Sequence, residues 1–302
     1  MRDYTSIINA LSDIDVACER DLSMARLTSF GIGGPADLLV APETPEQIST
    51  ALDVLAQEGV PVFVIGGGTN LLPADEGFRG VLLRASSLKC DPWKEGNFIA
   101  GAALPLDVLI LNALKNGLSG GEALYGIPGS VGGAIAMNAG AYGVWTGNIL
   151  TGITAFDMTG AEVEIDLENS FDYRVFAGRG KVVIAEAEFT FMSLDDPNIL
   201  RAKALEFSQR RSSTQPVGEK SAGCIFKNPG DDHAGRLIEA AGLKGRRIGD
   251  AKVSEIHGNF IINIGSATAR DIIELIGLIR DTVMAESGVE LGLEVVTPGY
   301  EI

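Results

Sequence analysis

The chain has 302 residues, of which 46% are hydrophobic and 21% charged, and its formal net charge is −16. That length predicts two packed units, and the composition predicts a globular rather than a disordered chain. The negative charge repels phosphate backbones and anionic lipids, so we expect no nucleic-acid partner and no membrane attachment. Three widely spaced cysteines and two histidines argue against a disulfide framework and a metal site.

The N-terminal part of the chain shows no export signal. No apolar segment follows Met1, and no run of about 18 apolar residues occurs further on, so we expect an unexported, cytoplasmic protein. A helix is predicted around residues 7–11, and a turn at 28–37 leads into a strand at 38–40.

A well-marked helix comes next. Thr44 can cap its N-terminus, Pro45 suits its first position, and Gln47 completes a capping box. Gly59 ends the helix, because glycine readily adopts the left-handed conformation needed there.

A loop rich in glycine follows a buried-strand pattern at 60–65. Its consecutive backbone N–H groups can form an anion-binding nest, and its polar side chains suit a pyrophosphate. The predicted cofactor contacts are Gly66, Gly67, Gly68, Thr69 and Asn70. A Rossmann loop opens directly into a helix, whereas residues 71–77 contain Pro and Gly and lead to another strand, so a Rossmann domain is disfavoured. A structural β-turn is the alternative.

A second glycine-rich segment, 126–143, follows a predicted helix near 104–111. It carries no charge, whereas flexible linkers are usually polar. Bare backbone can pack closely against a large flat ligand, to which side chains here can add hydrogen bonds. The predicted cofactor contacts are Pro128, Gly129, Ser130, Gly133, Asn138 and Gly140. A glycine-rich turn between packed helices is the alternative.

The middle of the chain alternates like strands at 153–157, 163–165 and 182–185. Tyr173 and Arg174 stand together between the last two of these. An arginine beside an aromatic residue can hold a carboxylate in a bidentate fork, although an ordinary surface ion pair is the alternative.

Positive charge is concentrated at the end of a predicted helix, 197–211, and just beyond it. Arg211, Lys220 and Lys227 can bind an anionic nucleotide there. A solvated helix end is the alternative.

The segment Ser221–Pro229 places a thiol, a cation and an amide within a few residues. Cys224 can donate a proton, and Lys227 and Asn228 can hold an anion or a carbonyl. Glu294 lies in a predicted apolar strand near the C-terminus, where a carboxylate is costly to bury unless it is paired. A solvating charge at a strand edge is the alternative.

Three further elements are predicted in the C-terminal part: a short helix at 236–241, a strand at 260–263 and a final helix. His257 is assigned a structural role at the start of the strand. The final helix carries one apolar stripe, which indicates a core face: Ile272, Ile276, Ile279 and Val283.

Taken together, these motifs resemble the UDP-N-acetylenolpyruvoylglucosamine reductase (MurB) family. The resemblance runs from about Thr28 to Gly299. The motifs that carry it are Thr28–Gly34, Val64–Leu72, Gly126–Gly133, Tyr173–Arg174, Ser221–Pro229 and Leu293–Val295.

The resemblance implies an α+β fold. An N-terminal helical segment, 1–26, is expected to precede a two-subdomain FAD-binding domain of the PCMH or vanillyl-alcohol-oxidase type at 27–192. A smaller α/β substrate-binding domain is expected at 193–302. The resemblance also implies noncovalent FAD, NADPH as hydride donor and UDP-N-acetylglucosamine enolpyruvate as acceptor, in an enzyme of peptidoglycan precursor synthesis. We expect a monomer.

In that scheme, hydride from reduced flavin reaches the enolpyruvyl methylene carbon and the resulting enolate is protonated at the neighbouring carbon. Arg174 is expected to hold the substrate carboxylate, Glu294 to assist as a proton-bearing or hydrogen-bonding partner and Cys224 to deliver the proton. The three groups are expected to converge opposite the flavin ring, and no metal is implied. The expected substrate contacts are Tyr173, Arg211, Lys227 and Asn228.

The chain departs from the family pattern at a few positions. Cys224 stands where the family often has serine, and a thiol releases its proton more readily than a hydroxyl. Phe176 and Gly292 replace a small hydroxyl residue and an additional glutamate. The short interval between Arg174 and Cys224 indicates the subclass without a tyrosine-bearing loop.

Two other functions fit parts of the sequence. One is another flavin oxidoreductase of the same superfamily, acting on an alcohol or hydroxy acid. Such enzymes often attach flavin through His or Cys, and neither glycine loop contains histidine. The other is a non-catalytic nucleotide-binding module, which would not need the set Arg174, Cys224 and Glu294.

Overall fold

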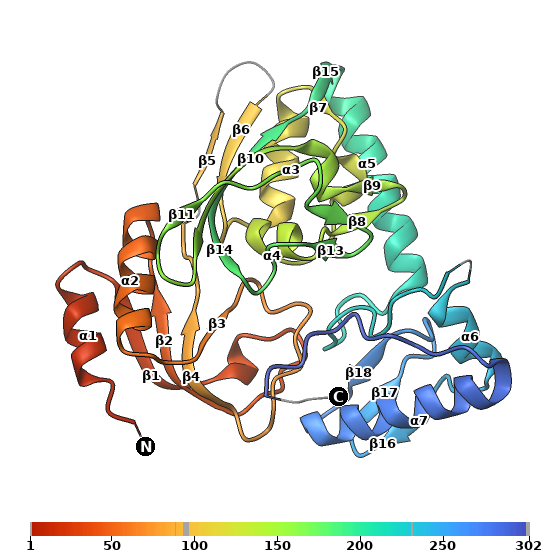
Figure 1. Ribbon diagram of the computed structural model, residues 1–302. Coiled ribbons are helices and arrows are strands. Elements are labelled where there is room, and N and C mark those ends of the chain that lie inside the picture. Colours follow the sequence, from red (N-terminus) through yellow and green to blue (C-terminus); the bar gives the residue numbers. More distant parts are fainter. Residues whose placement is uncertain (1, 88, 93–96, 231, 300–302) are drawn as a thin grey trace. The chain divides into compact units, whose positions relative to one another are not determined.

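A computed structural model of the chain describes residues 2–87, 89–92, 97–230 and 232–299 (Figure 1). The chain divides into two compact units, each assembled from separate stretches of sequence. The first unit consists of Met1–Arg20, Leu38–Gly67 and Gly80–Gln209. The second consists of Asp21–Asp37, Gly68–Arg79 and Arg210–Ile302. The second unit therefore includes two stretches that precede residue 80.

One sheet has four strands in the order β1 (Ala17–Ser23), β2 (Pro35–Ala41), β4 (Phe78–Leu83) and β3 (Val62–Val64). The unit boundaries fall within β1, β2 and β4. Helix α2 (Pro45–Gln57) links β2 to β3 in sequence, and both bonds of its predicted capping box are present. No helix follows β3 before β4 within these described residues, which confirms the prediction against a Rossmann loop.

A second sheet lies in the first unit and is antiparallel throughout. Its order is β11 (Glu162–Val163), β10 (Leu150–Asp157), β14 (Val182–Thr190), β6 (Asn97–Gly101) and β5 (Cys90–Pro92). Helix α2 contacts β10 and β14, and the short helix α4 (Val131–Ala136) contacts β14 and β6. The strands predicted at 153–157 and 182–185 are therefore present, in longer form.

Shorter elements complete the first unit. Its other helices are α1 (Thr5–Ser12), α3 (Leu106–Lys115), η2 (Glu122–Leu124), η3 (Thr146–Ile149) and α5 (Pro197–Thr214), whose last turn belongs to the second unit. Its paired short strands are β7 (Leu118–Ser119) with β15 (Met192–Leu194), β8 (Gly140–Ala141) with β9 (Val144–Trp145), and β12 (Phe171–Asp172) with β13 (Val175–Phe176).

The second unit has a three-stranded antiparallel sheet, β16 (Arg247–Ile248), β17 (Ala251–Val253) and β18 (Ile261–Asn263). Helices η1 (Met24–Arg26), α6 (Ala234–Ala240) and α7 (Ala269–Ser287) belong to it. Helix α7 contacts β16, β17 and α6 through its predicted apolar stripe, which is buried. Each such aliphatic side chain contributes about 1.5–3 kcal/mol of hydrophobic burial. The mixture of helices and sheets in the two units confirms the predicted α+β class.

Candidate functional site

The two glycine-rich segments touch one another in the first unit. A Cβ atom at Gly66 would lie 2.8 Å from Oγ of Ser130, and one at Gly67 would lie 3.0 Å from the backbone of Gly129. Only glycine lets these backbones approach so closely. Gly67 and Pro128 remain exposed beside this contact. Two adjoining bare backbones with accessible faces fit a flat cofactor that carries a diphosphate.

Ser130 and Asn138, both predicted to contact a cofactor, also have structural roles. Oγ of Ser130 accepts the N–H of Gly133 at 3.3 Å and so caps helix α4. Oδ1 of Asn138 accepts the N–H of Gly147 at 3.0 Å, and its Nδ2 donates to the carbonyl oxygen of Asp172 at 2.9 Å. Asn138 therefore ties strand β12 to the 3₁₀ helix η3.

The rest of the first glycine loop, Gly68 to Asn70 with Thr69 between them, belongs to the second unit. Gly68 has a φ of +66°, and a Cβ atom there would lie 1.7 Å from the carbonyl oxygen of Leu27. Nδ2 of Asn70 donates to the carbonyl oxygen of Glu294 at 3.0 Å. An amide predicted to contact a cofactor thus holds the backbone of a predicted catalytic residue.

Tyr173 and Arg174 form the turn between β12 and β13. Arg174 has a φ of +56°, a left-handed conformation that costs a non-glycine residue about 1–2 kcal/mol. Below the turn, the rings of Phe171 and Phe176 stack with 5.0 Å between their centres. The guanidinium carbon of Arg174 lies 5.4 Å from the ring centre of Trp145 and 5.9 Å from that of Tyr173. The structure therefore places the arginine against two aromatic rings.

Cys224 lies in the second unit between two other segments. Cys224 and Phe260 form a backbone bridge on one side. On the other side, the N–H of Glu294 donates to the carbonyl oxygen of Ile225 at 2.8 Å. Ile225 and Phe226 are fully buried, whereas Cys224 and Glu294 are half-buried. The structure therefore brings the backbones of two predicted catalytic residues into adjoining segments.

The predicted strand around Glu294 is wrong. Leu293 forms an isolated bridge with Phe226, and Val296 forms one with Leu71, so no continuous ladder develops. The segment pairs first with the backbone near Phe226 and then with the backbone near Leu71, and it forms hydrogen bonds with both.

Asn259 was not among the predicted site residues. Its side chain is buried, with Oδ1 accepting the N–H of Phe226 at 2.9 Å and Nδ2 donating to the carbonyl oxygen of Phe226 at 2.7 Å. Its own carbonyl oxygen accepts the N–H of Ile225 at 2.9 Å. One residue thus fixes the segment that carries Cys224. The available signal was a short amide side chain directly before an apolar strand.

His257 has the structural role predicted for it. Its Nδ1 accepts the N–H of Asn259 at 3.2 Å, and its ring packs edge to face on Phe260. Burial, helped by the charge of Lys244, lowers the pKa of His257 below its ordinary value. The described residues contain no group of three or more His, Cys, Asp or Glu side chains that could hold a metal ion.

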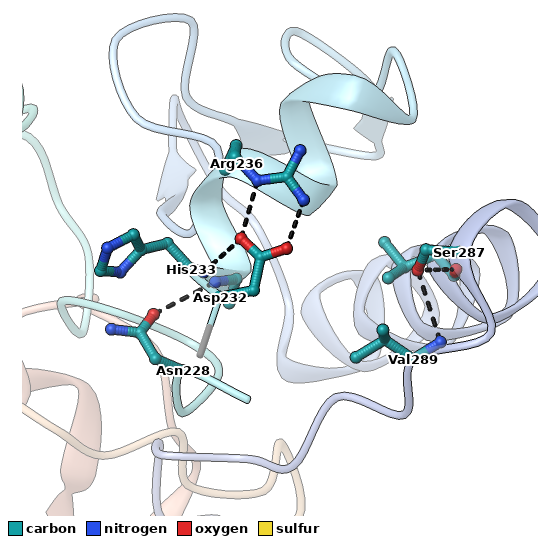
Figure 2. Close-up of polar contacts among 8 residues, drawn as sticks. Asn228, Asp232, His233, Arg236, Ser287 and Val289 are labelled. Carbon is teal, nitrogen blue, oxygen red and sulfur yellow. Dashed lines mark hydrogen bonds and ion pairs between the residues drawn. The ribbon is translucent and has the colours of Figure 1, made fainter. Parts of the chain in front are cut away.

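The side chain of Asn228 reaches the first residue of helix α6 (Figure 2). Its Oδ1 accepts the N–H of Ala234 at 3.1 Å. Beside it, the carboxylate of Asp232 accepts two hydrogen bonds from the guanidinium of Arg236. Those bonds and the N–H of His233 lower the pKa of Asp232 to about 2. The side-chain amide of Asn228, which is predicted to contact the substrate, therefore also bonds to a helix N-terminus.

The remaining predicted substrate contacts differ in exposure. Tyr173 is 40% exposed, and Lys227 is half-buried with its N–H bonded to the carbonyl oxygen of Gly292 at 2.8 Å. Arg211 is only 7% exposed, so the alternative of a solvated helix end does not hold for this residue. Arg174 belongs to the first unit and Cys224 to the second. Convergence of the catalytic groups stays a prediction.

Comparisons with known sequences identify related proteins over nearly the whole chain. Residues 215–297 match the C-terminal domain of UDP-N-acetylenolpyruvoylglucosamine reductase, and residues 36–166 match an FAD binding domain. The UDP-N-acetylenolpyruvoylglucosamine reductase of Geobacter sulfurreducens is 42% identical, covering 93% of this chain and 94% of its own. That of Synechococcus sp. (strain WH7803) is 39% identical, covering 98% of both chains.

A solved structure is also similar. The crystal structure of UDP-N-acetylenolpyruvylglucosamine reductase (MurB) from Thermus caldophilus matches with a TM-score of 0.80 and 34% identity, covering 93% of this chain and 99% of that one. In the described part of this chain, no helix has the length and apolar character needed to cross a membrane.

Proposed function

Because the chain belongs to the UDP-N-acetylenolpyruvoylglucosamine reductase family, we propose that it reduces UDP-N-acetylglucosamine enolpyruvate to UDP-N-acetylmuramate with NADPH. The fold is an FAD-binding domain of the PCMH type followed by a smaller C-terminal domain. The product is a precursor of cell-wall peptidoglycan. The observation that carries the proposal is 42% identity to such a reductase over 93% of the chain, with thiol, arginine and glutamate at the motif positions.

The proposed reaction saturates one carbon–carbon double bond. Bound FAD, which the two touching glycine segments would hold, would supply the two-electron chemistry that carries hydride from NADPH to the enolpyruvyl methylene carbon. A proton then adds to the neighbouring carbon, beside the carboxylate. One NADPH and one proton are therefore consumed for each lactyl ether formed.

Three side chains supply what the protein must add to this chemistry. Arg174 binds the substrate carboxylate and stabilises the negative charge that develops on it. Cys224 gives the proton from its Sγ atom, and Glu294 assists as a proton-bearing or hydrogen-bonding partner. Support for the last two roles is the bond between the backbone of Glu294 and that of Ile225, next to Cys224.

The other predicted contacts divide into residues that hold the cofactor and residues that hold the substrate. Backbone at the two touching glycine segments holds the flat cofactor noncovalently, through Gly66, Gly67, Pro128 and Gly129. The cofactor contacts predicted for the remaining residues of both loops are kept as part of the proposal. The substrate is held by Tyr173, Arg211, Lys227 and Asn228.

The proposal includes a monomeric, cytoplasmic protein without nucleic-acid partners. Cys18, Cys90 and Cys224 form no disulfide bonds among the described residues, which suits a reducing compartment. A net charge of −16 disfavours binding to nucleic acid.

A visible absorption spectrum of the purified protein tests the function. We expect flavin bands that bleach with NADPH under anaerobic conditions and recover when the enolpyruvate substrate is added. A non-catalytic module would consume no NADPH, and an alcohol or hydroxy-acid oxidase would bleach with such a substrate instead. After acid precipitation, a yellow supernatant indicates noncovalent flavin and a yellow pellet indicates covalent flavin.

A further inference from the structure

Trp145 contacts both residues of the turn that carries Arg174. Its ring centre lies 5.4 Å from the guanidinium carbon of Arg174. It also packs edge to face on Tyr173, with 5.4 Å between ring centres and 85° between ring planes. Tyr173 itself lies 5.9 Å from the same guanidinium carbon. The three side chains form one cluster within the first unit.

The position of the indole is fixed by its own hairpin. Gly140 pairs with Trp145 across β8 and β9, and a Cβ atom at Gly140 would lie 2.2 Å from the indole ring. Tyr142 and Gly143 both have positive φ, at 51° and 82°, so a tight turn joins the two strands. The N–H of Trp145 donates to Oδ1 of Asn148 at 2.8 Å. The indole ring therefore packs directly on the backbone of Gly140. A larger residue at position 140 would occupy the space of the ring.

The turn on the other side of the cluster is also held. The carbonyl oxygen of Asp172 accepts a hydrogen bond from Asn138 at 2.9 Å, and Oδ1 of Asp172 accepts the N–H of Tyr173 at 2.6 Å. Hydrogen bonds thus hold the backbone of the turn, while ring contacts hold the side chain of Arg174.

These contacts order a side chain that is otherwise mobile. An arginine side chain samples many rotamers, and binding a carboxylate must stop that motion. The negative face of an aromatic ring attracts a cation, and tryptophan does so most strongly. A guanidinium already held against two rings loses less freedom when its ligand arrives.

We infer that Trp145 is a positioning residue for Arg174, and that it sets how strongly the enzyme prefers a carboxylate to a neutral group on the three-carbon arm of its substrate. Gly140 acts with it by making room for the indole. The inference rests on the proposed function, because that function gives Arg174 a carboxylate to bind.

The experiment compares two ligands of the FAD-loaded protein, UDP-N-acetylmuramate and its carboxamide. Their dissociation constants are measured from the perturbation of the flavin spectrum, and their ratio is the carboxylate preference. Trp145→Leu should reduce this preference about five- to thirtyfold, which corresponds to the loss of about 1–2 kcal/mol at 1.36 kcal/mol per tenfold. Trp145→Phe should keep part of it. Tyr142→Leu, which removes another aromatic ring of the same hairpin, should leave it unchanged.

A second set of proteins keeps the shape of the ring. In a Trp93→Phe background, Trp145 is the only tryptophan, because the chain has two. Replacing it biosynthetically by 5-fluorotryptophan and 5,7-difluorotryptophan weakens the negative ring face with little change in size. The carboxylate preference should fall stepwise with each fluorine, which a purely structural role of Trp145 would not produce.

The outcomes separate the inference from the function. A preference that stays within twofold of wild type in the fluorinated proteins overturns the positioning role, even if Trp145→Leu fails to fold. A wild-type protein that consumes NADPH but shows no carboxylate preference overturns both this inference and the role of Arg174. Failure to oxidise NADPH with the enolpyruvate substrate overturns the proposed function itself.

Discussion

Replacement of Asn259 by alanine should weaken the fold around Cys224 more than its size suggests. The change removes both hydrogen bonds to Phe226, at 2.9 and 2.7 Å, and leaves an N–H and a C=O group without partners. Phe226 is 1% exposed and Asn259 is 2% exposed, so water does not reach either group easily. An unsatisfied buried polar group costs about 1–3 kcal/mol. For two such groups we therefore expect the free energy of unfolding to fall by about 2–6 kcal/mol, a large part of a typical total.

Two further variants separate hydrogen bonding from volume. Asn259→Asp keeps the volume of the side chain, but it buries a carboxylate and sets an oxygen against the carbonyl oxygen of Phe226, so at pH 7 it should lose at least as much stability as Asn259→Ala. Asn169→Ala removes an exposed asparagine that bonds only locally, to Asp166, and should change stability by less than about 0.5 kcal/mol.

Urea unfolding followed by circular dichroism, at a fixed excess of FAD, measures these differences. The rate of turnover is a second measurement of the same effect, because Cys224 is only two residues from Phe226. In Asn259→Ala, reoxidation of flavin by substrate should slow more than its reduction by NADPH. Stability within 0.5 kcal/mol of wild type together with normal reoxidation would refute the argument that this amide holds the Cys224 segment.

Other changes test separate parts of the structure. Cys224→Ser should retain turnover, whereas Cys224→Ala should still allow flavin reduction by NADPH and lose about 100-fold or more in reoxidation by substrate; equal stopped-flow rates would exclude the proton-donor role. Burial, and then the charge of Lys244, lower the pKa of His257 in the folded protein. As the pH falls below about 6.5, the unfolded chain therefore binds a proton at His257 more readily than the folded protein does. Stability should therefore drop there by at most about 1.4 kcal/mol per pH unit. Unfolding of His257→Gln at about pH 7.5 and 5.5 should show a smaller drop. Asp75→Ala removes the acceptor of two N–H groups at the start of α7, at 2.8 and 3.1 Å, and should cost about 1 kcal/mol in thermal or urea unfolding, whereas the neighbouring Glu76→Ala should cost less than half of that.

Local patterns predicted the regular elements well, because the interactions that form them lie close in sequence. The Thr44 and Gln47 capping box predicted the start of α2, and both of its bonds are present. The apolar stripe of the last helix predicted the buried face of α7. Contacts such as that of Gly66 with Ser130 join distant stretches, and nothing local in either stretch encodes the partner.

The segment around Glu294 shows where a local pattern misleads. A short apolar segment predicts a strand only if one neighbouring strand pairs with it along its whole length. Here Leu293 bridges Phe226, and Val296 bridges Leu71 three residues later. The pattern reports burial correctly, since Val295 is 5% exposed, but burial alone does not determine which backbone is the partner.

Three asparagines show why the role of a polar side chain is harder to predict from sequence than a helix or a strand. Asn70 bonds the backbone of Glu294, Asn138 bonds that of β12 before the Arg174 turn, and Asn259 bonds that of Phe226. An amide in a glycine-rich loop offers the same donor and acceptor to a cofactor as to a nearby peptide group, so composition cannot distinguish the two uses. The predicted catalytic residues lie on turns and isolated bridges, where no ladder of backbone hydrogen bonds continues. Side-chain amides take over that role, because buried backbone groups need partners wherever the ladder stops.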